Sequence, residues 1–317
     1  MCRMRFFYRV ADDLPFQEHR FPARDTNLDG SPTHKHSGEN CRKLTDQIPP
    51  GQALTERTSM DLGISGKNAF VTGGSRGLGK EAALALAREG VNVAVCARGQ
   101  DGLRKIQDEI ESTGVKALAF TADMAEEGAP AKAFDHVASE FGQIDILVNN
   151  VGGSLGTAGV LDSSEEDFKR VFDLNLWATI ALMKSAAPGM RERGWGRIIN
   201  IASIFGREHG GTAPYMTAKI SVIAATKHLA LEIARDGVCV NSIAPGSILH
   251  DQGSWERFTQ NNSEEVVAEF IDRNMPMGRF GWPEPVGATV AFLASQQAGL
   301  ITGACINVDG GQSHALF

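Results

Sequence analysis

The chain has 317 residues, of which 42% are hydrophobic and 22% charged, and its formal net charge is −7 at neutral pH. This length suits one large domain or two ordinary ones, and the acidic balance argues against a general nucleic-acid binder, which normally presents a basic face. No apolar run approaches the roughly 18 residues that a membrane span needs. The five cysteines are scattered without a C-x-x-C pair, so they predict neither a disulfide framework nor a metal site and favour a reducing compartment, the cytoplasm.

The first 59 residues form a different kind of sequence from the remainder. They show no steady hydrophobic period and contain breaker clusters such as Pro49-Pro50-Gly51. Such a segment buries little apolar surface, so residues 1–59 are expected to be a disordered or non-native extension. No secretory signal is indicated, because the apolar run Phe6-Phe7-Tyr8 is short and acidic residues follow it, whereas nearby arginines leave a transit peptide open. Met60 directly precedes the first patterned element, and we hypothesise that it is the native start.

From residue 68 onward, short β-rich runs alternate with helical patterns. This alternation, with strands that read as continuous apolar runs, is typical of a parallel sheet covered by helices on both faces. We therefore predict an α/β fold, a doubly wound parallel sheet of the Rossmann type, in one domain over residues 60–317. The expected strands are 68–72, 91–96, 116–121, 144–149, 196–202, 238–244 and 304–308, and the expected helices are 77–89, 101–113, 129–141, 165–190, 213–235, 264–273 and 285–295.

A glycine-rich turn, from Thr72 to Gly79, joins the first strand to the first helix. Glycines allow the backbone to approach a pyrophosphate closely, and a helix N-terminus offers free N–H groups and the positive end of a dipole. The spacing differs from G-x-G-x-x-G and a bare tight turn is the alternative, but the position between strand and helix favours a dinucleotide site. The candidate contacts in this turn are Gly73, Ser75, Arg76, Gly77, Leu78 and Gly79.

The end of the second strand bears on the choice between NAD and NADP. A carboxylate there would bind the ribose 2′-hydroxyl of NAD, but the sequence reads Cys96-Ala97-Arg98. Arg98, together with Arg76 in the glycine turn, can bind a 2′-phosphate with planar guanidinium donors. NADP is therefore the preferred cofactor and NAD the second choice, unless both arginines simply point into water.

A tyrosine and a lysine lie one turn apart near the start of a long expected helix. Tyr215 and Lys219 share a helix face, and Pro214 is favourable at a helix start. An ammonium beside a phenol favours the phenolate, so we expect a lowered pKa for Tyr215 and a role in acid–base chemistry. The same pair also occurs on solvated helix faces, so it does not decide the function alone. Ser203 ends the fifth expected strand, where ligand crevices lie in such sheets, and its hydroxyl can hold a substrate oxygen.

Several motifs occur in one order along the chain: the glycine turn, Asn149-Asn150-Val151-Gly152, Asn175, Ser203, Tyr215-x-x-x-Lys219 and Pro245-Gly246. With this order, the chain over about residues 60–317 resembles the short-chain dehydrogenase/reductase family, in the single-domain branch that contains the 3-oxoacyl-carrier-protein reductases. The resemblance implies hydride transfer between the nicotinamide of NADP or NAD and a carbonyl or secondary alcohol. It makes a 3-oxoacyl thioester the leading substrate.

The resemblance also implies roles for single residues. Ser203 would polarise the carbonyl, Tyr215 would exchange the proton, and Lys219 would bind the nicotinamide ribose and depress the Tyr215 pKa. Asn175 matches a residue that holds a proton-relay water, although a mid-helix Asn also suits packing or a kink. Asp123 matches an adenine contact, although Asp before a helix is an equally good N-cap. The other implied cofactor contacts are Met124, Asn149, Val151 (where Ala is more usual), Gly152, Pro245, Gly246 and Ile248.

The stretch of about residues 247–283 lies where the family carries its substrate lid. Trp255 and Phe258 could cap an apolar substrate, with packing of Trp255 against the body as the alternative. Gly253 and Gly278 could serve as flexible points, because lid motion commonly gates such enzymes. The loop over residues 153–159 is expected to line the same cleft.

Two other functions share parts of this pattern. A nucleotide-binding regulator would keep the fold without catalysis, but all four catalytic-type residues are present. An extended epimerase or dehydratase also uses a Tyr-x-x-x-Lys pair, with different glycine spacing. His209, His250 and His314 lack paired ligand spacing, so no metal is expected. The resemblance implies a homo-oligomer, a tetramer or dimer, that acts on a small molecule.

Overall fold

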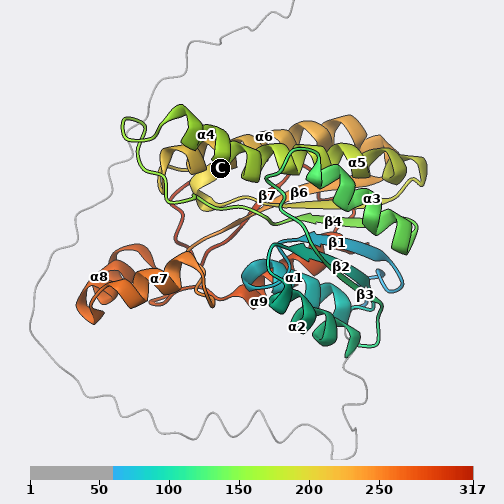
Figure 1. Cartoon of the computed structure of the whole chain (residues 1–317), viewed down its shortest axis with the longest axis horizontal. Coiled ribbons are helices and arrows are strands. Elements are labelled where there is room, and N and C mark those ends of the chain that lie inside the picture. Colours follow the sequence, from blue (N-terminus) through green and yellow to red (C-terminus); the bar gives the residue numbers. More distant parts are fainter. Residues whose placement is uncertain (1–59, 317) are drawn as a thin grey trace, which may run out of the picture. The chain divides into compact units, whose positions relative to one another are not determined.

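The computed structural model describes residues 60–316, and the expectations for residues 1–59 lie outside this range. Within the described range, parallel strands form one seven-stranded sheet in the order β3-β2-β1-β4-β5-β6-β7 (Figure 1). This is the expected doubly wound parallel sheet, and the strand bounds agree with the sequence patterns to within two residues. The strands are β1 Asn68–Thr72, β2 Asn92–Ala97, β3 Ala117–Thr121, β4 Ile146–Asn149, β5 Gly196–Ile201, β6 Val238–Pro245 and β7 Cys305–Val308.

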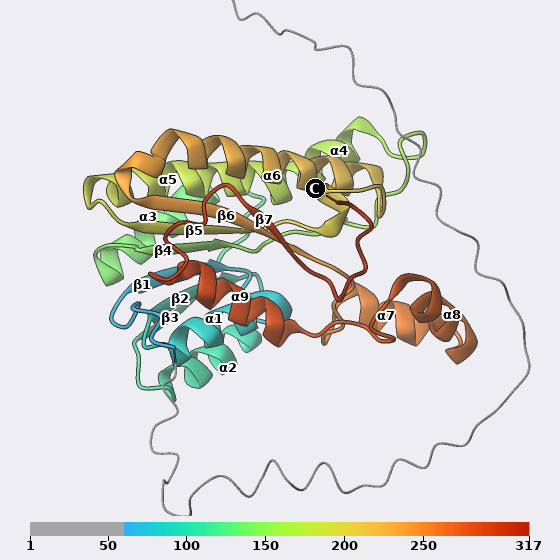
Figure 2. The ribbon, with the colours of Figure 1, turned by 180° about the vertical axis from the view of Figure 1, so that it is seen from behind.

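Helices cover both faces of the sheet. Figures 1 and 2 show α1, α2 and α9 on one face and α3, α4, α5 and α6 on the other, while α7 and α8 lie together beyond the sheet, between β6 and α9 in the chain. No helix among residues 60–316 is both long and apolar enough to cross a membrane. The helices are α1 Gly77–Arg88, α2 Gln100–Glu111, α3 Ala129–Phe141, α4 Glu165–Phe172, α5 Ala178–Glu192, α6 Ala213–Ile233, α7 Ser254–Asn261, α8 Glu264–Asn274 and α9 Pro283–Ala294.

One expected helix, over residues 165–190, is wrong in its continuity. A π-helical segment, Asp173–Trp177, separates α4 from α5. The side chain of Asn175 explains it, because its Nδ2 donates to the carbonyl of Val171 at 2.8 Å, four residues earlier. A side chain that takes over a backbone acceptor in this way loosens the regular ladder, and π-bulges of this kind often occur at functional sites.

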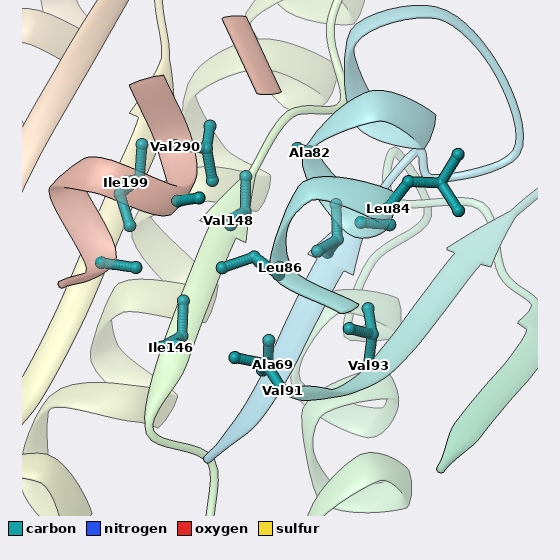
Figure 3. Packing of buried hydrophobic residues seen from close by; sticks show 14 of the residues in the cluster. Ala69, Ala82, Leu84, Leu86, Val91, Val93, Ile146, Val148, Ile199 and Val290 are labelled. Carbon is teal, nitrogen blue, oxygen red and sulfur yellow. The ribbon is translucent and has the colours of Figure 1, made fainter. Parts of the chain in front are cut away.

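The central strands are largely apolar because both of their faces are buried. Along β1, Ala69 and Val71 pack in a cluster with α1 and α9, and Phe70 packs in a second cluster with α3 and α5. The other central strands alternate in the same way, as Ile146 and Val148 of β4 show beside α1 (Figure 3). Period-2 alternation between two covered faces gives the continuous apolar runs that the sequence shows.

The order of the strands creates a point where a ligand can bind. From β1 the chain moves outward through β2 to β3 and then returns to place β4 on the other side of β1. The loops after β1 and β4 therefore leave the sheet in opposite directions, and ligands of doubly wound sheets bind in the crevice outside such a switch point.

Candidate active site

A cleft of about 1110 Å³ lies at the carboxyl ends of the strands and collects most of the residues proposed from the sequence. Four of those residues, Gly77, Gly79, Asn149 and Asn175, do not line it. The predicted residues that do are Gly73, Ser75, Arg76, Leu78, Arg98, Asp123, Met124, Val151, Gly152, Ser203, Tyr215, Lys219, Pro245, Gly246 and Ile248.

The glycine turn is shaped for close approach to a ligand. A Cβ atom at Gly79 would lie 2.3 Å from the carbonyl oxygen of Gly73, so only glycine lets α1 pack this tightly against the turn. Gly77 has φ of 55°, which favours glycine because other residues are strained there. No side chain caps the start of α1 and its first turn holds no acidic residue, which leaves the helix N-terminus available to a phosphate.

Sequence reasoning missed the residue that holds this turn in place. The Nδ2 of Asn150 donates to the carbonyl of Thr72 at 3.0 Å and to that of Gly73 at 3.2 Å. Its position next to the predicted Asn149 was the available signal. Phe205 and Thr212 also line the cleft, and no local pattern marks either of them.

The two arginines proposed for the 2′-phosphate both reach the cleft. Arg98 and Arg76 have exposed side chains, and Arg76 Nη1 donates to the Oε1 of Gln252 at 2.5 Å. Asp123 Oδ1 accepts from the Ala125 N–H at 3.0 Å, so the carboxylate shapes a turn before α3. The N-cap alternative for Asp123 is wrong, because the N-cap of α3 is Gly128. Beside the glycine turn, the cleft is thus lined by two guanidinium groups, Arg76 and Arg98, and by the carboxylates of Asp101 and Asp123.

Three side chains meet at the other end of the cleft. Ser203 follows β5 and is 7% exposed, and its Oγ accepts the Phe205 N–H at 3.2 Å. Tyr215 and Lys219 extend from the first two turns of α6, and the Lys219 Nζ lies 5.6 Å from the Tyr215 ring centroid. Lys219 is 3% exposed, and its Nζ donates to the Ile201 carbonyl at 2.8 Å. These residues come from a strand end and an adjacent helix start, which fixes their relative positions.

The expected lowering of the Tyr215 pKa is wrong for this structure. Burial raises the pKa of Tyr215, and a hydrogen bond with Ser203 acts in the opposite direction. Because the Tyr215 side chain stays partly exposed to the cleft, solvent limits the size of this rise. Burial lowers the pKa of Lys219 to about 8, since low-dielectric surroundings disfavour an ammonium. Burial is the largest cause of both shifts, and a sequence pattern does not reveal it.

Asn149 and Asn175 lie behind the wall of the cleft. Asn149 is buried and its Nδ2 donates to Asn200 Oδ1 at 2.8 Å, which ties β4 to β5. Asn175 donates to the Gly153 carbonyl at 2.9 Å and accepts the Gly153 N–H at 3.1 Å. A Cβ atom at Gly152 would lie 2.6 Å from Asn175 Oδ1 and 2.8 Å from Lys219 Nζ. Asn175 therefore disrupts the regular helix and also lies near Lys219, as both sequence interpretations of this residue suggested.

Aromatic side chains dominate the segment between β6 and α9. Trp255 lines the cleft and packs against Phe270 and Phe280, with ring centroids 4.9 Å and 5.5 Å away. Phe258 joins the same cluster at 5.6 Å from Trp255. Trp255 therefore packs within its own segment while it also faces the cleft, a combination that neither sequence alternative described. The loop over residues 153–159 lines the cleft from the other side through residues 153–156.

Comparison with known proteins places this geometry in a family. A family model described as "Enoyl-(Acyl carrier protein) reductase" matches residues 73–313. The "3-oxoacyl-[acyl-carrier-protein] reductase FabG" of Staphylococcus aureus (strain Mu50 / ATCC 700699) is 37% identical over 247 residues, which cover 77% of this chain and 97% of that protein. The chain belongs to the short-chain dehydrogenase/reductase family. It is an NAD(P)-dependent oxidoreductase.

Solved structures of this family share the fold but differ in ligands. L-sorbose reductase from Gluconobacter frateurii, complexed with NADPH and L-sorbose, matches with a TM-score of 0.76 and 32% identity over 81% of this chain and 100% of that chain. A 7α-hydroxysteroid dehydrogenase, complexed with NADH and 7-oxo glycochenodeoxycholic acid, matches with a TM-score of 0.73 and 29% identity over 81% and 98%. Family membership alone therefore does not identify the substrate or the preferred dinucleotide, and both depend on the residues of this chain.

The residues present fit a nicotinamide dinucleotide. The close glycine packing around the turn, the uncapped α1 terminus and the two arginines suit the phosphates. At the other end, Gly152 has no side chain that would fill the space beside Lys219. Among residues 60–316, no group of three or more His, Cys, Asp and Glu side chains could hold a metal ion.

Proposed function

We propose that the chain is an NADP-preferring reductase of a ketone or 3-oxoacyl thioester, in which Ser203, Tyr215 and Lys219 carry out the proton chemistry. The observation that carries this proposal is the convergence of these side chains in one cleft with the glycine turn and the two arginines. The 3-oxoacyl part rests on the name of the Staphylococcus aureus relative.

The proposed chemistry divides between the cofactor and the chain. The dinucleotide supplies a hydride at nicotinamide C4 when it is bound. Ser203 and Tyr215 donate hydrogen bonds to the substrate oxygen, and Tyr215 transfers its hydroxyl proton to that oxygen as negative charge develops there. Lys219 stabilises the resulting phenolate, because its ammonium lies beside the ring. Asn175, whose Oδ1 lies close to Gly152 as the Lys219 Nζ does, is assigned to the proton relay.

Oxidation of NADPH with a panel of neutral ketones and 3-oxoacyl thioesters tests the proposed reaction. We expect turnover of at least one class, with a higher kcat/KM for NADPH than for NADH. Tight binding of NADPH without turnover across the panel would favour the alternative, a nucleotide-binding regulator that has lost catalysis. Failure to bind either dinucleotide would contradict the proposal altogether.

The preference for NADP depends on Arg98 in this proposal. Arg98→Asp should raise the Kd for NADPH by about 10- to 100-fold, because a charge-assisted hydrogen bond contributes about 1.5–3 kcal/mol. The new carboxylate should instead favour NADH, since it can accept a hydrogen bond from a ribose 2′-hydroxyl. Fluorescence titration with both dinucleotides measures the two affinities.

Arg104→Asp provides a matched control for this substitution. Arg104 is an exposed residue of α2 that does not line the cleft, so it undergoes the same change of charge away from the site. An equal loss of NADPH affinity in both variants would show that net charge, and not a contact to the 2′-phosphate, sets the preference.

The organisation of the whole chain also belongs to the proposal. Residues 60–317 form the catalytic domain, with about 247–283 as its substrate lid. A homo-oligomer, a tetramer or dimer, is supported by large apolar side chains exposed near and along α6, which include Trp177, Ile220 and Leu231. A cytoplasmic location rests on the pattern of cysteines in the sequence alone.

A further inference from the structure

The C-terminal segment after β7 folds back over the start of the lid. Asp309 shapes the segment, because its carboxylate accepts the Gly311 and Ser313 N–H groups at 3.0 Å and 2.9 Å. This turn presents Gln312, which is only 8% exposed although it lies five residues from the end of the chain. We call residues 309–315 the C-terminal strap.

Gln312 binds one residue at two points. Its Oε1 accepts the Ser247 N–H at 2.7 Å, and its Nε2 donates to Ser247 Oγ at 2.9 Å. Ser247 is 2% exposed and directly follows Pro245 and Gly246, and all three line the cofactor cleft. A Cβ atom at Gly246 would lie 2.6 Å from Gln312 Oε1, so glycine is required there for the amide to approach.

Ser247 is also the base of the lid. Its carbonyl accepts the Gly281 N–H at 3.0 Å, and the Gly281 carbonyl accepts the Leu249 N–H at 2.9 Å. These two bonds close the neck of the lid at both of its ends. Gln312 therefore fixes a residue that belongs both to the cleft wall and to the lid neck.

The C-terminal strap also binds the loop that follows Ser203. Glu208, in the loop that follows Ser203, accepts three hydrogen bonds on one carboxylate oxygen, from Ser313 Oγ at 3.0 Å and from the N–H groups of His314 and Ala315 at 2.7 Å and 2.9 Å. The strap thus bridges the Ser203 loop and the lid neck.

We propose that Gln312 is a positioning residue for the cofactor, which holds the segment from Pro245 to Ser247 and the neck of the lid in the geometry that binds the nicotinamide end. This inference rests on the proposed function, because it assumes that the dinucleotide binds in this cleft. The strap would couple lid closure to the loop of Ser203, since neither neighbour can shift without breaking bonds to it.

Hydrogen exchange on the wild-type protein tests the strap without a variant. The amides of Ser247, Leu249 and Gly281 should exchange as slowly as those in the β6 ladder, even without cofactor, because each donates to a defined acceptor. Exchange at the rate of exposed loops would overturn the inference. This measurement does not depend on catalysis, so it remains decisive if the proposed reaction fails.

Gln312→Met tests the link to the cofactor. Methionine keeps the length and flexibility of the side chain but makes neither bond to Ser247, and it leaves a buried N–H group unpaired. We expect the Kd for NADPH, measured by fluorescence titration, to rise about 10-fold. The amides of the lid neck should also exchange faster.

Thr302→Val is the matched control, because Thr302 Oγ1 accepts the Val240 N–H at the other end of β6 at 3.1 Å. It removes a bond of the same kind, between a side-chain oxygen and a backbone N–H, within β6 and far from the cleft. An unchanged Kd in this variant beside a raised Kd in Gln312→Met supports the positioning role. An unchanged Kd in Gln312→Met, or an equal rise in both variants, overturns it. If the wild type itself fails to bind NADPH, the proposed function falls instead.

Discussion

Replacing Tyr215 with Phe should lower kcat by about 100- to 10,000-fold, the range that a positioned general acid contributes. The substitution removes only the hydroxyl, and the ring keeps its packing at the start of α6 and its place beside Lys219. The Kd for NADPH should stay within about fivefold of the wild-type value, because a single neutral hydrogen bond contributes about 1 kcal/mol. Steady-state kinetics and cofactor titration separate these two effects.

The pH dependence of the wild type follows from the same group. Reduction needs the protonated hydroxyl, and burial raises the pKa of Tyr215. The cofactor-free enzyme therefore keeps the acid form through neutral and mildly alkaline pH, which suits the reductive direction. Oxidation of an alcohol needs the phenolate and should increase with pH.

Thr217→Val is the control for the loss of a hydroxyl from this helix. Thr217 Oγ1 donates only within α6, to the carbonyls of Ala213 and Pro214, and Thr217 does not line the cleft. Its kcat should remain close to that of the wild type. Turnover by Tyr215→Phe at the wild-type rate would show that another group delivers the proton.

The sequence predicted the fold and the place of the site because both follow from local patterns. The central strands are buried on two faces, and this burial gives them largely apolar runs in the sequence. Residues that end such strands necessarily gather at one edge of a parallel sheet. Ser203 after β5 and Gly73 after β1 therefore reach one cleft, although 130 residues separate them in the chain.

What the sequence did not predict depends on contacts between distant segments. The π-helical turn arises from a bond that Asn175 makes with the backbone, and an Asn in a helical pattern suits packing or a kink without specifying this turn. The direction of the Tyr215 pKa shift depends on how deeply the folded chain buries the phenol. Gln312 lies 65 residues from Ser247, and no motif links them. These features can be recognised only in the folded chain.

Replacing Lys219 with Met should reduce activity while the folded state remains at least as stable near neutral pH. The pKa of Lys219 is lowered from 10.5 to about 8 by burial. This shift corresponds to a folding penalty of about 3 kcal/mol at pH 7, since one pKa unit is about 1.4 kcal/mol. Methionine removes the penalty but leaves the Ile201 carbonyl without its donor, which costs about 1–3 kcal/mol.

The dependence on pH separates these two contributions. Between pH 8 and 10.5 the unfolded wild type binds more protons than the folded one, so its stability rises with pH across this window. Lys219→Met lacks this rise. The free energy of unfolding, measured in urea at pH 7 and pH 10, should therefore shift by about 2–3 kcal/mol in favour of the wild type between the two conditions.

Lys227→Met serves as the control, because Lys227 is an exposed residue of the same helix and should leave the pH profile unchanged. If the free energy of unfolding of Lys219→Met changed with pH in the same way as that of the wild type, the ammonium would not be buried as described. The buried ammonium of Lys219 weakens the fold, and we propose that it is kept for its position beside Tyr215 in the cleft. Activity about 100-fold lower in a variant that folds as well as the wild type would show that this residue serves the chemistry at the expense of stability.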